Sequence, residues 1–180
     1  QGLKAIKMQV AHIRPWREDV ENVRAMREAM GGDIEIMIDV NMGWDADTAI
    51  QAGHRIDEFD PYWLEEPVVA EDFAGYRRIA AALKTRIVGG ESHFGRNDLR
   101  PFFEHPSTPI LQPDPMRGGF SELRKIAAAA EPWASASPPI SSMRPWCTSW
   151  PRSPTPTTSN TWTGTTTSGS SRCCRRKPAP

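Results

Sequence analysis

The last 47 residues of this 180-residue chain contain no aspartate and no glutamate. All 22 acidic residues lie in residues 1–133 with 16 of the 22 lysines and arginines, which gives that part a net charge of −6 and residues 134–180 a charge of +6. The zero net charge of the whole chain therefore averages two unlike segments. We predict that residues 1–133 form a folded domain and that residues 134–180 do not belong to it.

Other absences narrow the class of protein. Residues 1–133 have no cysteine, so disulfides are not expected and a cytoplasmic location is the default prediction. No apolar run approaches the roughly 20 residues of a membrane span. Because the sequence opens on a strand-like segment, we expect no signal peptide. We expect neither a membrane nor a nucleic acid as a partner.

Strand-like and helical patterns alternate along residues 1–133. Strands are predicted at 5–10, 34–39, 62–64, 87–89 and 109–112. Helices are predicted at 18–30, 45–59, 72–83, 97–103 and 121–130, with Asp45 or Asp47, Asn97 or Asp98, and Ser121 as N-caps. No hairpin signal interrupts this order, so the fold is α/β, either a doubly wound sheet or a (β/α)₈ barrel. The first strand lacks a following glycine-rich phosphate turn, which favours the barrel.

Carboxylates follow three of these strands. Glu65 lies in the stretch Trp-Leu-Glu-Glu-Pro, and Asp39 and Glu91 end strand-like runs at equal distances from it, 65−39 = 26 and 91−65 = 26 residues. That interval suits one βα unit, so the three carboxylates would meet at one edge of a parallel sheet. Such oxygen ligands suit Mg²⁺. Any one of them alone would more simply be a helix cap or a solvated loop charge.

These residues carry a family resemblance over residues 1–133. The chain resembles the barrel domain of the mandelate racemase/muconate-lactonising group of the enolase superfamily through five segments in order, AIKMQ, IDVN, WLEEP, GGE and QPDPMRGG. The resemblance implies a partial (β/α)₈ barrel of about five βα units. It also implies Mg²⁺-dependent removal of a proton α to a carboxylate, with the enediolate stabilised by the metal.

The resemblance also implies roles for individual residues. Asp39, Glu65 and Glu91 would bind Mg²⁺, and Lys7 and Asn41 would contact the carboxylate of a small-molecule substrate, a sugar acid. Asp114 would be the acidic partner of a catalytic histidine on the next strand. Intact members of the group are expected to be homo-oligomers.

Gln9 departs from the family pattern. The strand motif is usually Lys-x-Lys with the second lysine as a base, and here it reads Lys7-Met8-Gln9. A glutamine amide cannot take up a proton at neutral pH, which disfavours racemisation by two opposed bases. Dehydration of a sugar acid by a single His–Asp pair is favoured instead. Alternatively, Gln9 is only a polar residue lining the barrel.

The catalytic histidine is the second departure. None of the four histidines falls on the expected next strand, where this chain reads ASASPPISS. His93 lies two residues after Glu91 and could reach the substrate, although a role in the loop or behind the site is the stronger reading.

A shifted reading frame would explain both the missing histidine and the composition of residues 134–180. Trp133 to Arg144 can be encoded so that one base restored after the tryptophan codon yields WGVRVSPHLFNE, which resembles the family's next strand. The alternative is a genuine linker rich in serine, threonine and proline, which make up 27 of these 47 residues. In either case we predict a disordered tail, because it has too few aliphatic residues to offset the entropy of ordering.

The chain is thus predicted to be a piece of an acid-sugar dehydratase that lacks the first barrel strand and the N-terminal capping domain, with impaired catalysis. A racemase or cycloisomerase of the same superfamily is the alternative among enzymes. A non-catalytic remnant that binds a metal or a partner is the alternative from another class.

Overall fold

The computed structural model describes residues 4–12, 15–105 and 107–130. Five strands, β1 (Ala5–Gln9), β2 (Glu35–Asp39), β3 (Trp63–Glu65), β4 (Ile87–Gly89) and β5 (Ile110–Leu111), form one sheet. Each is followed by a helix: α1 (Trp16–Met30), α2 (Ala46–Ile56) with the 3₁₀ turn η1 (Asp57–Phe59), α3 (Phe73–Ala82), α4 (Gly95–Glu104) and α5 (Pro115–Ala130). Within the described residues, no helix is both long and apolar enough to cross a membrane.

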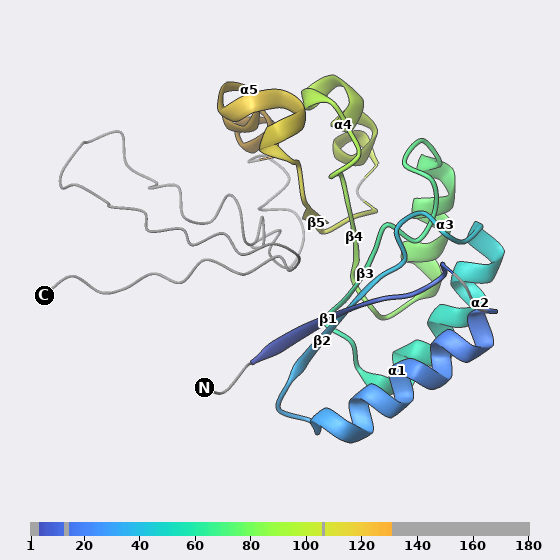
Figure 1. The fold of residues 1–180 in the computed structure, drawn as a ribbon. Helices are drawn as coiled ribbons and strands as arrows, with labels where there is room; N and C mark the ends of the chain where they lie inside the picture. The colour runs from blue at the N-terminus through green and yellow to red at the C-terminus, as the bar shows by residue number, and fades with distance from the viewer. Residues whose placement is uncertain (1–3, 13–14, 106, 131–180) are drawn as a thin grey trace, which may run out of the picture.

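The strand order separates the two α/β architectures. All four strand pairs are parallel and the order is β1-β2-β3-β4-β5, without the reversal that defines a doubly wound sheet. In Figure 1 α1, α2 and α3 lie together on one side of the strands, and α4 and α5 lie above β4 and β5. The predicted partial barrel of five βα units is therefore confirmed. The predicted disorder of residues 134–180 concerns a segment outside the described residues.

Side chains of the strands alternate between two apolar layers. The layer against the helices is the larger core, and it contains the fully buried residues Ile36, Ile38, Leu64, Ile79, Ile87 and Leu99. The opposite face, which would line the inside of a barrel, carries a small cluster made of Trp63, Val88 and Ile110 with Met37 and Tyr62 packed against it. This inner layer packs beneath the side chains at the ends of the strands, and Trp63 in it also contacts Glu65.

Helix capping confirms part of the sequence prediction. Asp45 is the N-cap of α2 and accepts a hydrogen bond from the Thr48 backbone N–H at 2.7 Å. Asp72 caps α3 in the same way, with the Gly75 N–H at 2.8 Å. These two caps fix where α2 and α3 begin, whereas α1 and α4 have no side-chain cap.

One predicted helix start is wrong, and one helix is longer than predicted. Helix α4 begins at Gly95, and Asp98 lies in its first turn, where its carboxylate accepts from the Phe94 N–H at 3.0 Å. Helix α5 spans Pro115–Ala130, and Asp114 accepts from the Met116 N–H at 2.8 Å in its first turn. Gly119 (φ 72°, ψ 168°) is not helical and divides α5 at a kink, so the helix predicted at 121–130 is found after this kink.

Candidate metal and substrate site

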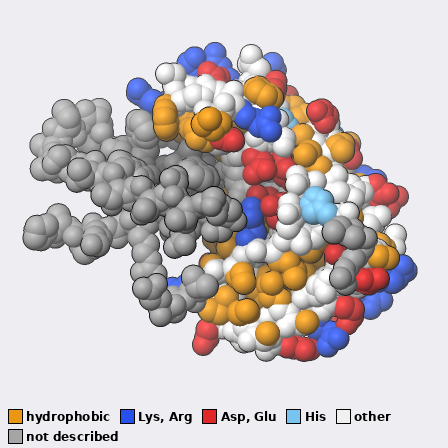
Figure 2. All heavy atoms as spheres, in the orientation of Figure 1, with side chains coloured by type: hydrophobic (Ala, Val, Ile, Leu, Met, Phe, Trp, Pro, Cys, Tyr) orange, Lys and Arg blue, Asp and Glu red, His pale blue; other side chains and the backbone are white. Residues whose placement is uncertain are grey.

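Acidic side chains gather where the parallel strands end. The register places Gln9, Asp39 and Glu65 side by side on the inner face of β1, β2 and β3. Glu91 follows the end of β4 by two residues. In Figure 2 acidic side chains lie together near the middle of the visible face, with a basic side chain beside them. The fold therefore brings residues from four separate segments to one edge of the sheet.

Lys7 joins two of these carboxylates. Its ammonium lies 3.0 Å from Asp39 Oδ2 and 3.0 Å from Glu65 Oε1. The Trp63 indole N–H donates to Glu65 Oε2 at 3.0 Å. Glu65 is almost fully buried, at 1% exposure, whereas Lys7 keeps 36% of its side chain exposed. The ammonium can therefore reach a molecule that arrives from solvent while it remains next to Glu65.

The site holds more negative charge than Lys7 neutralises. Burial raises the pKa of Glu65, and neighbouring Asp39 adds to the effect, although Lys7 opposes it. Loss of solvent and then Asp39 likewise raise the pKa of Glu91. Burial followed by repulsion from Glu91 raises the pKa of Glu66 to about 7. Burial alone would lower the pKa of Lys7, but Glu65 and Asp39 together raise it. A further positive charge would stabilise this arrangement.

The backbone at this edge is strained in a way that the sequence does not reveal. Among the residues that the structure describes, four of the five non-glycine residues at positive φ follow the ends of β1, β2 and β3: Ala11 (70°), Asn41 (47°), Met42 (62°) and Glu66 (40°). Non-glycine residues seldom adopt this conformation, and such strain concentrates at functional sites. Hydrogen bonds fix it: Met42 N–H donates to the Glu66 carbonyl at 2.7 Å, and Asn41 N–H donates to Asp39 Oδ1 at 3.1 Å.

The donor chemistry fits a hard divalent cation, and without one Lys7 neutralises only part of the charge of the cluster. Within the described residues, no three His, Cys, Asp or Glu side chains converge so as to hold a metal ion together. Lys7 occupies the space between Asp39 and Glu65 instead. Carboxylate oxygens and a surplus of negative charge suit Mg²⁺.

Comparison with known proteins gives the family. Residues 1–140 match the family described as enolase C-terminal domain-like. That match covers more than half of the chain and contains all the strand-end carboxylates. The chain belongs to the mandelate racemase/muconate-lactonising group of the enolase superfamily.

Relatives within this group have several activities. The chain is 39% identical over 132 residues to a 3,6-anhydro-alpha-L-galactonate cycloisomerase of Streptomyces coelicolor, covering 72% of this chain and 36% of that protein. It is 37% identical to an L-talarate/galactarate dehydratase of Salmonella typhimurium, covering 69% and 31%. A solved structure of a racemase from Streptomyces coelicolor with bound magnesium superposes with a TM-score of 0.69 at 37% identity, covering 73% of this chain and 37% of that one. The chain thus spans about a third of the length of these relatives.

The other residues predicted for this enolase-superfamily site lie in different surroundings. Gln9 is exposed on the inner face beside Asp39. Asn41 lies in the strained loop after β2. Asp114 follows β5, and its Oδ1 is used in the turn that begins α5. The histidine predicted to pair with Asp114 would fall in residues outside those described.

His93 lies behind this edge rather than in it. It is buried, its ring packs against Phe73 of α3 and Phe102 of α4, and its Nε2 lies 3.1 Å from the Ala70 carbonyl. Burial lowers the pKa of His93, which favours the neutral ring. This geometry supports the alternative reading, in which His93 joins the loops after β3 and β4.

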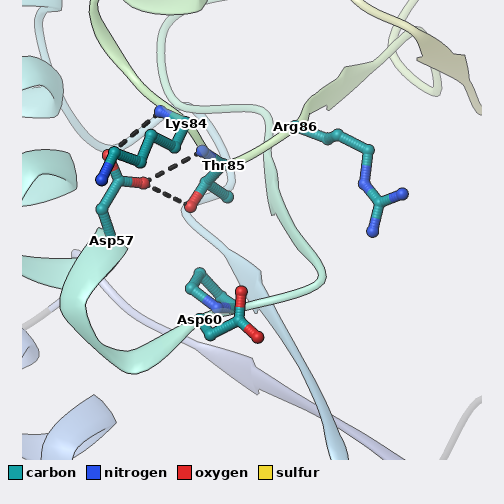
Figure 3. A pocket seen from close by; sticks show the side chains of 6 residues that line it. Asp57, Asp60, Lys84, Thr85 and Arg86 are labelled. Atoms are coloured by element: carbon teal, nitrogen blue, oxygen red, sulfur yellow. Dashed lines mark hydrogen bonds between the residues drawn. The ribbon is translucent and has the colours of Figure 1, made fainter. Parts of the chain in front are cut away.

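A pocket of about 330 Å³ lies at the opposite end of the strands, lined by Asp57, Asp60, Pro61, Lys84, Thr85 and Arg86. Figure 3 shows Asp57 turned toward the backbone that leads into β4. Its carboxylate accepts hydrogen bonds from Lys84 N–H and Thr85 N–H at 3.0 Å each and from the Thr85 hydroxyl at 2.5 Å. Asp57 therefore stabilises the fold by holding the segment before β4 against the 3₁₀ turn η1.

Replacing Asp57 with alanine should lower the free energy of unfolding by about 2 kcal/mol, because the buried donors of Thr85 lose their acceptor. Urea denaturation monitored by circular dichroism measures this loss. Exposed Glu58 in the same 3₁₀ turn is the matched control, and its replacement by alanine should change stability by less than about 0.5 kcal/mol. Equal effects of the two changes would contradict the role given to Asp57.

Proposed function

We propose that this chain is part of a Mg²⁺-dependent enzyme that removes a proton α to the carboxylate of a sugar acid, and that the reaction is a dehydration. The observation that carries the proposal is the pairing of Lys7 with Asp39 and Glu65 at the ends of three adjacent strands. Relatives named as dehydratases of talarate, galactarate and other sugar acids support the substrate class.

The cation would be held by the carboxylates of Asp39, Glu65 and Glu91. When bound, it would supply the concentrated positive charge that a dianionic enediolate requires. Lys7 would then be released from part of its present pairing, and its half-exposed ammonium would bind the substrate carboxylate. The Trp63 indole would keep the Glu65 carboxylate turned toward the site through the bond at 3.0 Å.

Proton transfer limits what the described residues can do alone. Gln9 stands where a second base would be needed, and its amide cannot take up a proton at neutral pH. Asn41, fixed by the strained turn, can offer its amide N–H to a substrate oxygen. Asp114 can orient a histidine from the next strand, which would take the α-proton and return it to the departing hydroxide. A single acid–base pair suffices for dehydration.

A cycloisomerase or racemase is the second candidate, because a cycloisomerase is the relative at 39% identity. The test uses the full-length protein with the reading frame restored after Trp133, incubated with aldonic and aldaric acids in D₂O. Dehydration yields a 2-keto acid, which is the expected result. Deuterium at the α-carbon without a keto acid would support the second candidate instead. If neither product forms, the result would favour a non-catalytic remnant that binds metal or a partner.

A further inference from the structure

Glu66 is a second buried carboxylate that the proposed mechanism does not use. Its side chain is 1% exposed, and neither carboxylate oxygen has a hydrogen-bond partner among the described residues. Glu65 is buried to the same degree but is paired with Lys7 and Trp63. A buried ionised group without a partner is costly, so an isolated Glu66 would be selected against unless something supplies the missing charge.

The backbone fixes the position of Glu66. Its N–H donates to the Val88 carbonyl at 2.9 Å, and its carbonyl accepts from Met42 N–H at 2.7 Å. Its φ of 40° lies in the left-handed region, where glutamate is seldom found. These bonds tie Glu66 to β4 on one side and to the loop that carries Asn41 on the other. The side chain therefore cannot easily turn out to solvent.

The charged neighbours of Glu66 are mainly acidic. Repulsion from Glu91, Asp39 and Glu65 acts on its carboxylate. The Ser92 side chain lies near enough to favour the charged form, but it does not meet the geometry of a hydrogen bond to either oxygen. The nearby ammonium of Lys7 already pairs with Asp39 and Glu65. A cation shared by the cluster is the group that would balance this charge.

We propose that Glu66 is a positioning residue of the cation site, whose carboxylate accepts hydrogen bonds from water molecules bound to Mg²⁺ and adds negative charge behind Glu65 and Glu91. This inference rests on the Mg²⁺ site of the proposed function. The rival role is structural: the Tyr76 hydroxyl is also buried without a partner, and Glu66 is its foremost charged neighbour. In that case Glu66 would serve the packing of α3 and not the cation.

The test titrates MgCl₂ into the chain by calorimetry and records thermal melting with and without Mg²⁺, for wild type and Glu66→Gln. We expect Glu66→Gln to raise the Mg²⁺ dissociation constant at least about tenfold. We also expect it to raise the melting temperature without metal, since a buried unpaired charge is removed, and to shrink the shift caused by Mg²⁺. Glu66→Asp, which keeps the charge, should recover part of the affinity. Glu71→Gln, an exposed carboxylate in the following loop, is the matched control and should change none of these.

The outcomes separate this inference from the proposed function. A lower melting temperature without metal, together with unchanged Mg²⁺ affinity, would overturn it in favour of the structural role beside Tyr76. If Glu65→Gln abolishes Mg²⁺ binding while Glu66→Gln leaves it intact, the inference alone fails. If wild type binds no Mg²⁺, or Glu65→Gln binds it as wild type does, the proposed metal site fails and the inference falls with it.

Discussion

Glu65→Gln is expected to weaken Mg²⁺ binding by at least about a hundredfold, equivalent to about 2.7 kcal/mol. Glu65 is the most buried of the three predicted ligands, so its charge is the least screened by water. The substitution keeps the shape of the side chain and its bond to the Trp63 indole, so the loss would report charge and not packing. Activity of the full-length protein should fall with the metal affinity.

Calorimetric titration of MgCl₂ into purified wild type and variant measures the change. Gln9→Ala is the matched control, because Gln9 lies in the same row of the sheet but offers no charged oxygen. Its affinity for Mg²⁺ should stay within about threefold of wild type. Undiminished affinity in Glu65→Gln would remove Glu65 from the metal site.

In the absence of metal, the stability of the chain should depend on pH in a direction set by Glu66. Burial and Glu91 raise the pKa of Glu66 from an ordinary 4.5 to about 7. Between these values the folded state holds the proton more tightly than the unfolded chain, so the contribution of Glu66 to the free energy of unfolding falls as pH rises. The full effect is on the order of 3 kcal/mol.

The comparison of wild type with Glu66→Gln isolates this contribution. His93 acts in the opposite direction, since burial lowers its pKa and its contribution rises with pH up to about 6.5, but both proteins contain it. Denaturation in EDTA between pH 5 and 8 should show the variant gaining on wild type as pH rises. A difference that is constant with pH would mean that Glu66 has an ordinary pKa.

The sequence predicted the fold because its signals are local and repeated. Each strand is a short apolar run followed by an amphipathic helix, and Asp45 is a capping residue in the position that caps require. The start of α4 was missed because the expected caps, Asn97 and Asp98, lie inside the helix. For α5 the segment at 121–130 was predicted, but not the turn before the kink at Gly119. A usable signal for that turn was present in Asp114-Pro115, since aspartate before a proline suits the first turn of a helix.

The site was only partly predictable for a physical reason. Spacing alone places Asp39, Glu65 and Glu91 at one edge, because the βα repeat sets it. Pairing of Lys7 with Asp39 and Glu65 depends on the register of three strands, which no local pattern contains. The two glutamates of Trp-Leu-Glu-Glu-Pro look alike in sequence, and the left-handed backbone at Glu66 is what directs the second one into the protein. His93 is near Glu91 in sequence and was a candidate for the site, but a role in the loop was favoured, and its packing among aromatic side chains supports that interpretation.

The most direct measurement of the central claim is anomalous diffraction from crystals of the chain grown with MnCl₂, since Mn²⁺ takes the same oxygen ligands as Mg²⁺. The account predicts one strong anomalous peak at the C-terminal edge of the sheet, within coordinating distance of carboxylate oxygens from Asp39, Glu65 and Glu91, with Lys7 moved away from at least one of them. A peak only in the pocket beside Asp57 and Asp60, or no peak between the strand ends, would contradict it.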